Sequence, residues 1–286
     1  MAAREKVTLA RLGECKRAAR KFSVLTCYDA PTARLMEAAG VEVLLVGDTA
    51  GEVILGLPST RDIPPDFLIA LTAAVRRAAP RALVMADLPY ACRRDNDPAT
   101  ASAWARRFFV ETGSDAVKIE VTRDDAPLVE AIRDAGVPVV AHLGLLPQMI
   151  DPATGYRAQG KEAESARALI EAAARLENAG AVMLLLEAVA SEAARQIVTR
   201  TSLPVIGCLA GPHCDGTVVV LHDMIGLGGG HPPRAVKRYE NLSEVLARAF
   251  AAYVQDVHAG RFPTEEHAIH MKPGELERLL SAIGGG

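Results

Sequence analysis

The sequence predicts a closed barrel of parallel strands and surrounding helices, the (β/α)8 or TIM barrel of the α/β class, with a short helix before the first strand. Strand-like and helical segments alternate six or seven times along the 286 residues. Several strand segments are near-continuous apolar runs, which is typical of parallel strands covered on both faces. The same alternation also fits an open doubly wound sheet. We expect one barrel domain over residues 1–270 and a C-terminal tail over 271–286.

The first elements carry clear end signals. Thr8 is a suitable cap for a short N-terminal helix, and residues 22–28 form a β-branched and aromatic run that predicts the first strand. Asp29 is best explained as the cap of the next helix, which Gly40 ends. The apolar run 41–48 then predicts the second strand.

The middle of the chain repeats this pattern, with caps and glycines between segments. Asp97 followed by a proline begins one helix, and Gly260 ends the last secure one, over 242–259. Further helices are expected over about 64–79, 97–113, 124–135, 161–179 and 191–200, and strands over about 82–88, 116–121, 137–143, 181–186 and 203–209.

The seventh unit is irregular. Only residues 210–216 separate the strand 203–209 from the apolar run 217–221, whereas a parallel crossover normally needs a dozen or more residues. Either the seventh helix is missing, or residues 217–224 are that helix and the eighth strand is poorly marked. The sequence leaves both alternatives open.

Composition favours small-molecule chemistry. The net charge is −3 without a long basic run, and only 4% of the residues are aromatic, which argues against nucleic-acid binding. No uncharged apolar run approaches eighteen residues, so we expect no membrane segment. The five cysteines are scattered and odd in number, which indicates reduced thiols and a cytoplasmic location.

The segment 116–121 is the most informative strand. Because side chains alternate between the faces of a strand, Lys118 and Glu120 share one face, where a core is expected. Charged side chains are rarely buried unless they are paired or bind a metal, so this face suggests a site. An edge strand with one wet face is the alternative.

Other polar residues follow the predicted strands, at the end of a barrel where active sites lie. Carboxylates that face each other repel unless a cation or a proton separates them. Three of them sharing Mg²⁺ would explain the pattern, with Lys118 offsetting the charge of an anionic substrate. The residues at or just past predicted strand ends are Asp48, Asp87, Glu120, His142 and Glu187.

Other candidates are weaker. The spacing of Cys208, His213, Cys214 and His222 fits no standard zinc site. The glycine-rich stretch 226–230 is more simply a turn than a phosphate loop, and His267 and His270 are most simply solvated.

Several short motifs resemble the ketopantoate (3-methyl-2-oxobutanoate) hydroxymethyltransferase family over about residues 7–270. In order, they are Val46-Gly-Asp48-Thr-Ala-Gly51, Ala86-Asp87-Leu-Pro89, Val117-Lys118-Ile-Glu120, Ala141-His142-Leu-Gly-Leu145 with Pro147-Gln148, Leu186-Glu187 and Leu221-His222-Asp223. The resemblance implies a barrel of the phosphoenolpyruvate mutase type. It also implies a homo-oligomer, commonly a decamer, that transfers a hydroxymethyl group from 5,10-methylenetetrahydrofolate to 3-methyl-2-oxobutanoate in pantothenate biosynthesis.

The resemblance also assigns roles to residues. It implies a magnesium site and contacts to the 2-oxo acid, with Glu187 as the general base. The implied metal ligands are Asp48, Asp87 and Glu120, and the implied substrate-binding residues are Asp48, Thr49, Asp87, Lys118 and His142.

The chain departs from the family pattern in loops. Thr49 stands where the family usually has Ser, residues 57–64 differ, and the usual Gly-Ile-Gly-Ala-Gly is Gly207-Cys-Leu-Ala-Gly211. The acceptor acid and the one-carbon donor therefore stay open, and a divergent Mg²⁺-dependent 2-oxo acid aldolase or carbon–carbon lyase is one alternative. A catalytically silent, metabolite-binding barrel is another, but the presence of both Lys118 and Glu187 argues against it.

Overall fold

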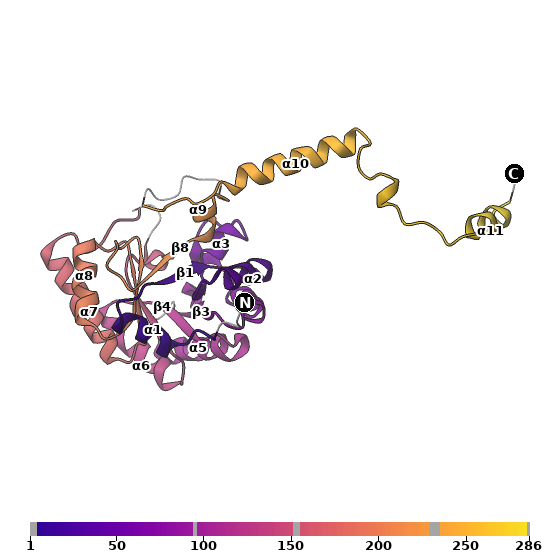
Figure 1. The fold of residues 1–286 in the computed structure, drawn as a ribbon. Helices are drawn as coiled ribbons and strands as arrows, with labels where there is room; N and C mark the ends of the chain where they lie inside the picture. Colours follow the sequence, from indigo (N-terminus) through magenta and orange to yellow (C-terminus); the bar gives the residue numbers. More distant parts are fainter. Residues whose placement is uncertain (1–4, 94–95, 151–154, 229–234, 285–286) are drawn as a thin grey trace. The chain divides into compact units, whose positions relative to one another are not determined.

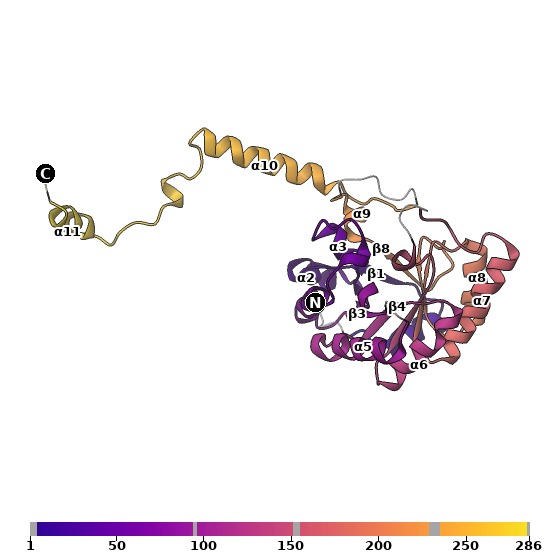
Figure 2. The ribbon, with the colours of Figure 1, turned by 180° about the vertical axis from the view of Figure 1, so that it is seen from behind.

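The computed structural model describes residues 5–93, 96–150, 155–228 and 235–284. Eight parallel strands form a closed barrel in chain order, and β8 pairs with β1. Helices α2, α5, α6, α7 and α8 surround the strands (Figures 1 and 2). The predicted (β/α)8 barrel is confirmed, and the open doubly wound sheet is wrong.

The strands lie close to their expected positions. They are β1 (Phe22–Thr26), β2 (Val43–Val46), β3 (Leu83–Asp87), β4 (Ala116–Glu120), β5 (Val139–Gly144), β6 (Met183–Glu187), β7 (Val205–Cys208) and β8 (Gly216–Val219). The helices are α1 (Leu9–Arg17), α2 (Ala30–Ala39), α3 (Ala50–Val53), α4 (Pro65–Ala78), α5 (Pro98–Thr112), α6 (Ala126–Asp134), α7 (Ala163–Asn178), α8 (Ser191–Arg200), α9 (Leu221–Ile225), α10 (Leu242–His258) and α11 (Glu275–Ala282).

The chain divides into two compact units. The first, Met1–Met224 with Gly228–Arg238, holds the barrel, and the second, Ile225–Leu227 with Tyr239–Gly286, holds α10 and α11. The domain boundary expected at residue 270 stays a prediction. None of the helices in the described ranges is both long and apolar enough to cross a membrane.

Helix ends follow the signals in the sequence. The Asp29 carboxylate accepts a hydrogen bond from the Thr32 N–H at 2.8 Å, and Gly40 ends α2 with a φ of 98°. The Thr8 hydroxyl caps α1 in the same way, accepting from the Arg11 N–H at 3.2 Å. Asp29 is therefore a helix cap, as expected.

The N-terminal end of the barrel is closed by apolar packing. Leu12 and Cys15 of α1 belong to the same buried cluster as Phe22, Val24 and Leu45 from the strands. Burying a large apolar side chain contributes roughly 1.5–3 kcal/mol to the stability of the fold. This apolar cluster is therefore a main source of the barrel's stability. The opposite, C-terminal end is left for polar groups.

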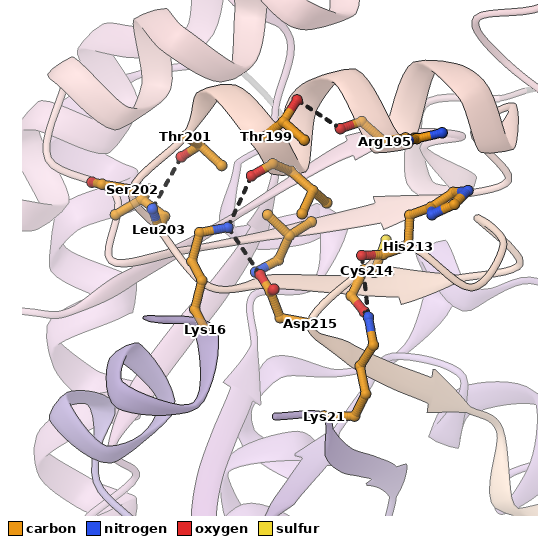
Figure 3. Close-up of polar contacts among 12 residues, drawn as sticks. Lys16, Lys21, Arg195, Thr199, Thr201, Ser202, Leu203, His213, Cys214 and Asp215 are labelled. Atoms are coloured by element: carbon orange, nitrogen blue, oxygen red, sulfur yellow. Dashed lines mark hydrogen bonds and ion pairs between the residues drawn. The ribbon is translucent and has the colours of Figure 1, made fainter. Parts of the chain in front are cut away.

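The seventh unit has no helix, so the missing-helix alternative is the correct one. Residues 209–215 connect β7 to β8, and the two strands pair in parallel. Asp215 accepts a hydrogen bond from Lys16 Nζ at 3.0 Å (Figure 3) and another from the Val205 N–H at 2.9 Å. Lys21 Nζ donates to three consecutive carbonyls over 212–214. Two lysines of the N-terminal segment thus anchor the connection where a helix normally packs.

Candidate functional site

All the predicted site residues line one cavity at the C-terminal mouth of the barrel. They are Asp48, Thr49, Asp87, Lys118, Glu120, His142 and Glu187. Five consecutive strands, β2 to β6, deliver them, because the C-terminal ends of parallel strands meet at one end of a barrel. Their proposed roles stay predictions, but their convergence is a property of the fold.

The inward face of β4 is charged and buried. Lys118 is 4% exposed and Glu120 is 1% exposed. The edge-strand alternative is wrong, because β4 pairs with both β3 and β5. Lys118 Nζ lies 2.7 Å from Asp87 Oδ1 and 3.4 Å from His142 Nδ1. Burial lowers the pKa of Lys118, but the carboxylates of Asp87, Asp48 and Glu120 outweigh burial and raise it, so the ammonium stays charged.

The carboxyl groups resist ionisation. Burial raises the pKa of Asp87 to about 7 against the opposing effect of Lys118, and burial raises the pKa of Glu120 well above its usual value. The Asp48 N–H donates to Asp87 Oδ2 at 3.1 Å, which holds the ends of β2 and β3 together. Several carboxyl groups facing one ammonium form a site that a cation would stabilise.

His142 lies between two carboxyl groups. Its Nε2 is 3.4 Å from Glu187 Oε2 and its Nδ1 is 3.9 Å from Glu120 Oε1. Burial and the nearby Lys118 hold the pKa of His142 well below its usual value, so the imidazole is neutral. Because the Lys118 ammonium can only donate hydrogen bonds, His142 Nδ1 is the acceptor and Nε2 carries the hydrogen. That N–H faces Glu187.

Glu187 has the properties of a proton acceptor. Burial raises its pKa to about 7, although Lys118 opposes the shift. A general base works best when its pKa is near the operating pH, because it is then partly ionised and still basic enough to take a proton. Its position at the end of β6, on the wall of the cavity, exposes the carboxylate to a bound acid.

Gln148 is a site residue that the sequence did not single out. It is fully buried in η4 (Pro147–Met149), its N–H donates to Glu120 Oε2 at 3.1 Å, and its Nε2 donates to Asp48 Oδ2 at 2.8 Å. The amide thus joins two of the expected metal ligands from different strands. Only its place in the Pro147-Gln148 pair of the family pattern signalled it.

Arg93 supports the end of β4, which carries Glu120. This 2% exposed residue donates from Nη1 to the Glu120 carbonyl at 2.5 Å and lies 3.5 Å from the Asp125 carboxylate. It fixes the end of β4 through the backbone. Nothing in the periodicity of the loop before α5 indicated a buried arginine.

The donor set fits a magnesium ion that also binds substrate. Among the described residues, no three His, Cys, Asp or Glu side chains are arranged as a ready metal site, and this includes the cysteines and histidines near residues 208–222. Mg²⁺ is usually held by one or two carboxylates, with waters and substrate oxygens completing its shell. The carboxyl groups of Asp48, Asp87 and Glu120 line one cavity and are donors of this type, and the magnesium site stays a prediction.

Of the weaker candidates that the structure describes, Cys208 lines the cavity, whereas residues 226–228, His267 and His270 do not. The stretch 226–230 lies partly outside the described residues. His267 and His270 are exposed, as expected. His267 Nδ1 accepts a hydrogen bond from the Thr264 N–H at 3.2 Å.

A comparison with family models decides the assignment. The model described as ketopantoate hydroxymethyltransferase matches residues 6–265. The chain belongs to this family. As a ketopantoate hydroxymethyltransferase family member it is a transferase of pantothenate biosynthesis, and the expectation of an enzyme is confirmed.

Curated relatives agree over nearly the whole chain. A protein of Halalkalibacterium halodurans is 42% identical over 272 residues, which cover 95% of this chain and 97% of the relative. A protein of Hyperthermus butylicus is 43% identical and covers 99% and 97% of the two chains. Both are named 3-methyl-2-oxobutanoate hydroxymethyltransferase.

Solved structures support the fold of the family. A phosphonopyruvate hydrolase matches with a TM-score of 0.61 and 11% identity, covering 95% of this chain and 94% of that one. A phosphoenolpyruvate phosphomutase from Streptomyces platensis subsp. rosaceus matches with a TM-score of 0.58 and 17% identity over 96% of both chains. At these identities the likeness concerns the fold alone, and it agrees with the predicted (β/α)8 barrel.

Proposed function

We propose that the protein transfers a hydroxymethyl group from 5,10-methylenetetrahydrofolate to 3-methyl-2-oxobutanoate, giving 2-dehydropantoate, with Mg²⁺ as cofactor. The observation that carries the proposal is the buried cavity in which the charged Lys118 and the weakly acidic Glu187 face the same space. Such a cavity suits a small anion that must lose a proton.

The acceptor acid would bind through its charge and its oxygens. Asp48, Asp87 and Glu120 would hold Mg²⁺, which acts, when bound, as a Lewis acid toward the carbonyl and carboxylate oxygens of the acid. Lys118 donates to the anion, and the Thr49 hydroxyl lines the same cavity. A phosphonopyruvate hydrolase of the same fold, 11% identical with a TM-score of 0.59, was solved with oxalate and Mg²⁺, which supports this arrangement.

Glu187 would take the proton from C3 of the bound acid. A positioned general base contributes typically about 10²- to 10⁴-fold to the rate. His142 Nε2 lies 3.4 Å from Glu187 Oε2, next to the group that would take the proton. The resulting carbanion equivalent bonds to the one-carbon unit, whose two bonds to folate nitrogens break, and water supplies the hydroxyl group. The proton taken by Glu187 and the remaining proton of water go to these two nitrogens, and tetrahydrofolate leaves.

Proton NMR of 3-methyl-2-oxobutanoate in D₂O tests the two halves of the reaction separately. With protein and Mg²⁺ we expect the C3 proton signal to disappear, and EDTA to prevent its loss. Adding 5,10-methylenetetrahydrofolate should then yield 2-dehydropantoate.

The other outcomes discriminate between alternatives. Exchange without transfer would point to another electrophile and to an aldolase or lyase. Neither exchange nor product would mean a different acceptor acid or a silent site.

We also propose a cytoplasmic homo-oligomer, a decamer as in the family pattern. All five cysteines are free thiols, which supports a reducing compartment. Sedimentation velocity of the purified protein tests the assembly, and a single monomeric species would overturn that part.

A further inference from the structure

A second cavity opens beside the one that holds the predicted acceptor site. It is lined by Glu52, Leu145, Tyr156, Leu209, Val220 and Asp223, among others. Thr49 and Glu187 line both cavities. A molecule in this outer cavity would therefore lie next to the proposed base and to the carbon that it deprotonates.

Two residues of the outer cavity have strained backbones. Ala188 has a φ of +48° and Leu209 a φ of +54°, the left-handed region that residues other than glycine rarely adopt. They directly follow β6 and β7, and the Ala188 N–H donates to the Cys208 carbonyl at 2.8 Å, which ties the two turns together. Strain of this kind gathers where ligands bind, because the surrounding structure must hold it in place.

Leu209 is the more informative of the two. Glycine is the residue that adopts a left-handed backbone without a steric penalty. The chain carries a Cβ and an apolar side chain there, and Leu209 is one of the residues that line the outer cavity. A turn alone needs no such side chain, so its function lies in the cavity.

The chemistry of the outer cavity suits a flat ring with polar edges. Leu145, Leu209 and Val220 provide apolar surface, and the carboxyl groups of Glu52 and Asp223 are acceptors for N–H groups. Burial raises the pKa of both carboxyl groups. A pteridine has two apolar faces and N–H donors along one edge.

We propose that Leu209 is a specificity-determining residue for the one-carbon donor, its side chain forming an apolar wall against one face of the pteridine ring. This inference rests on the proposed function, which supplies a folate as the second substrate. It goes beyond that function in naming the residue of this chain that selects the donor.

Leu209→Ala and Leu209→Gly together test the proposal. Alanine removes the apolar wall and keeps the strained Cβ, whereas glycine removes both. We expect each variant to raise the Kd for tetrahydrofolate and the KM for 5,10-methylenetetrahydrofolate about tenfold, since each loses most of a leucine side chain's apolar contact. Mg²⁺-dependent C3 exchange without donor should stay within twofold of the wild type.

Thermal unfolding adds a readout for the strain. The Leu209→Gly protein should unfold at a higher temperature than the Leu209→Ala protein, because only glycine relieves the left-handed backbone. Ala19→Gly, at another left-handed position outside both cavities, is the matched control. It should leave the donor Kd and KM unchanged.

Each contrary result is decisive. Unchanged donor binding in both variants, or an effect of glycine alone, would overturn the proposed wall. An equal loss of exchange and transfer would place Leu209 in the acceptor site instead. Failure of the wild-type protein to bind tetrahydrofolate would overturn the proposed donor itself, and this inference with it.

Discussion

The two ends of the barrel both bury charges, but they treat them differently. At the N-terminal end, Asp115 precedes β4 and accepts hydrogen bonds from Arg76 Nη1 at 2.7 Å and from the Val84 N–H of β3 at 2.9 Å. Asp215 precedes β8 and repeats this arrangement with Lys16 and with the N–H at the start of β7. Asp115 also pairs with Lys6 Nζ at 2.6 Å, so each aspartate there has at least one cation and one backbone donor of the preceding strand.

The C-terminal end has no such balance. The cavity collects the carboxyl groups of Asp48, Asp87, Glu120 and Glu187 around a single ammonium, Lys118, among the described residues that line it. Burial raises the pKa of three of the four carboxyl groups. Paired charges hold a structure together, whereas an excess of one sign leaves room for a ligand of the other sign. The difference marks which end is the functional one.

The largest effect expected at the mouth follows from Glu187→Gln. Glutamine keeps the shape but accepts no proton, so C3 exchange should fall by about 10²- to 10⁴-fold. Mn²⁺ binding, followed by electron paramagnetic resonance, should persist because the expected ligands are intact. Exchange at the wild-type rate would remove Glu187 from the mechanism.

At the opposite end, Asp215→Ala should affect stability and leave the chemistry unchanged. The substitution removes the charged partner of the largely buried Lys16, and we expect a loss of about 3 kcal/mol in the free energy of unfolding by urea. Asp66→Ala, which breaks an exposed pair with Arg107, is the control and should leave the stability nearly unchanged, because exposed ion pairs contribute little. A marked fall in exchange per folded molecule would contradict the division between the two ends.

Gln148→Met tests whether a neutral residue at the C-terminal end supports the expected metal ligands. Methionine fills a similar volume but cannot hold Asp48 and Glu120 in place. Loss of such supporting contacts typically lowers metal affinity about 10- to 100-fold, and calorimetry with Mg²⁺ measures it. Gln196→Met, on the exposed face of α8, should not change the affinity.

The smallest effect concerns pH. Because burial raises the pKa of Glu187 to about 7, the folded protein binds more protons than the unfolded chain between about pH 4.5 and 7. The metal-free wild type should therefore lose stability relative to Glu187→Gln as the pH rises through this window. We expect on the order of 1 kcal/mol, since solvent at the mouth screens the charge. Thermal unfolding of both proteins at several pH values checks this. A stability difference between them that does not change with pH would contradict it.

Much of this architecture was predictable because it depends on local signals. Strand ends carry the site, so Lys118, Glu120 and Glu187 were predictable from alternation and from their place in the order of elements. Gln148 and Arg93 were not, because they lie in loops without periodicity and reach the site through tertiary contacts. The run 217–221 was undecidable because a short apolar stretch fits either a strand or a helix. Its strand form depends on pairing with β1, which only the closed barrel provides.

The anchoring of the β7–β8 connection by Lys16 constrains how the chain is made. The contact between Lys16 and Asp215 spans 199 residues, and β1 finds its second neighbour only in β8. During translation the N-terminal helix and first strand therefore leave the ribosome long before their partners exist. The ring of strands closes only after residue 219 has emerged, so closure is a late, non-local step of the kind that folds slowly. Until then β1 has one open strand edge.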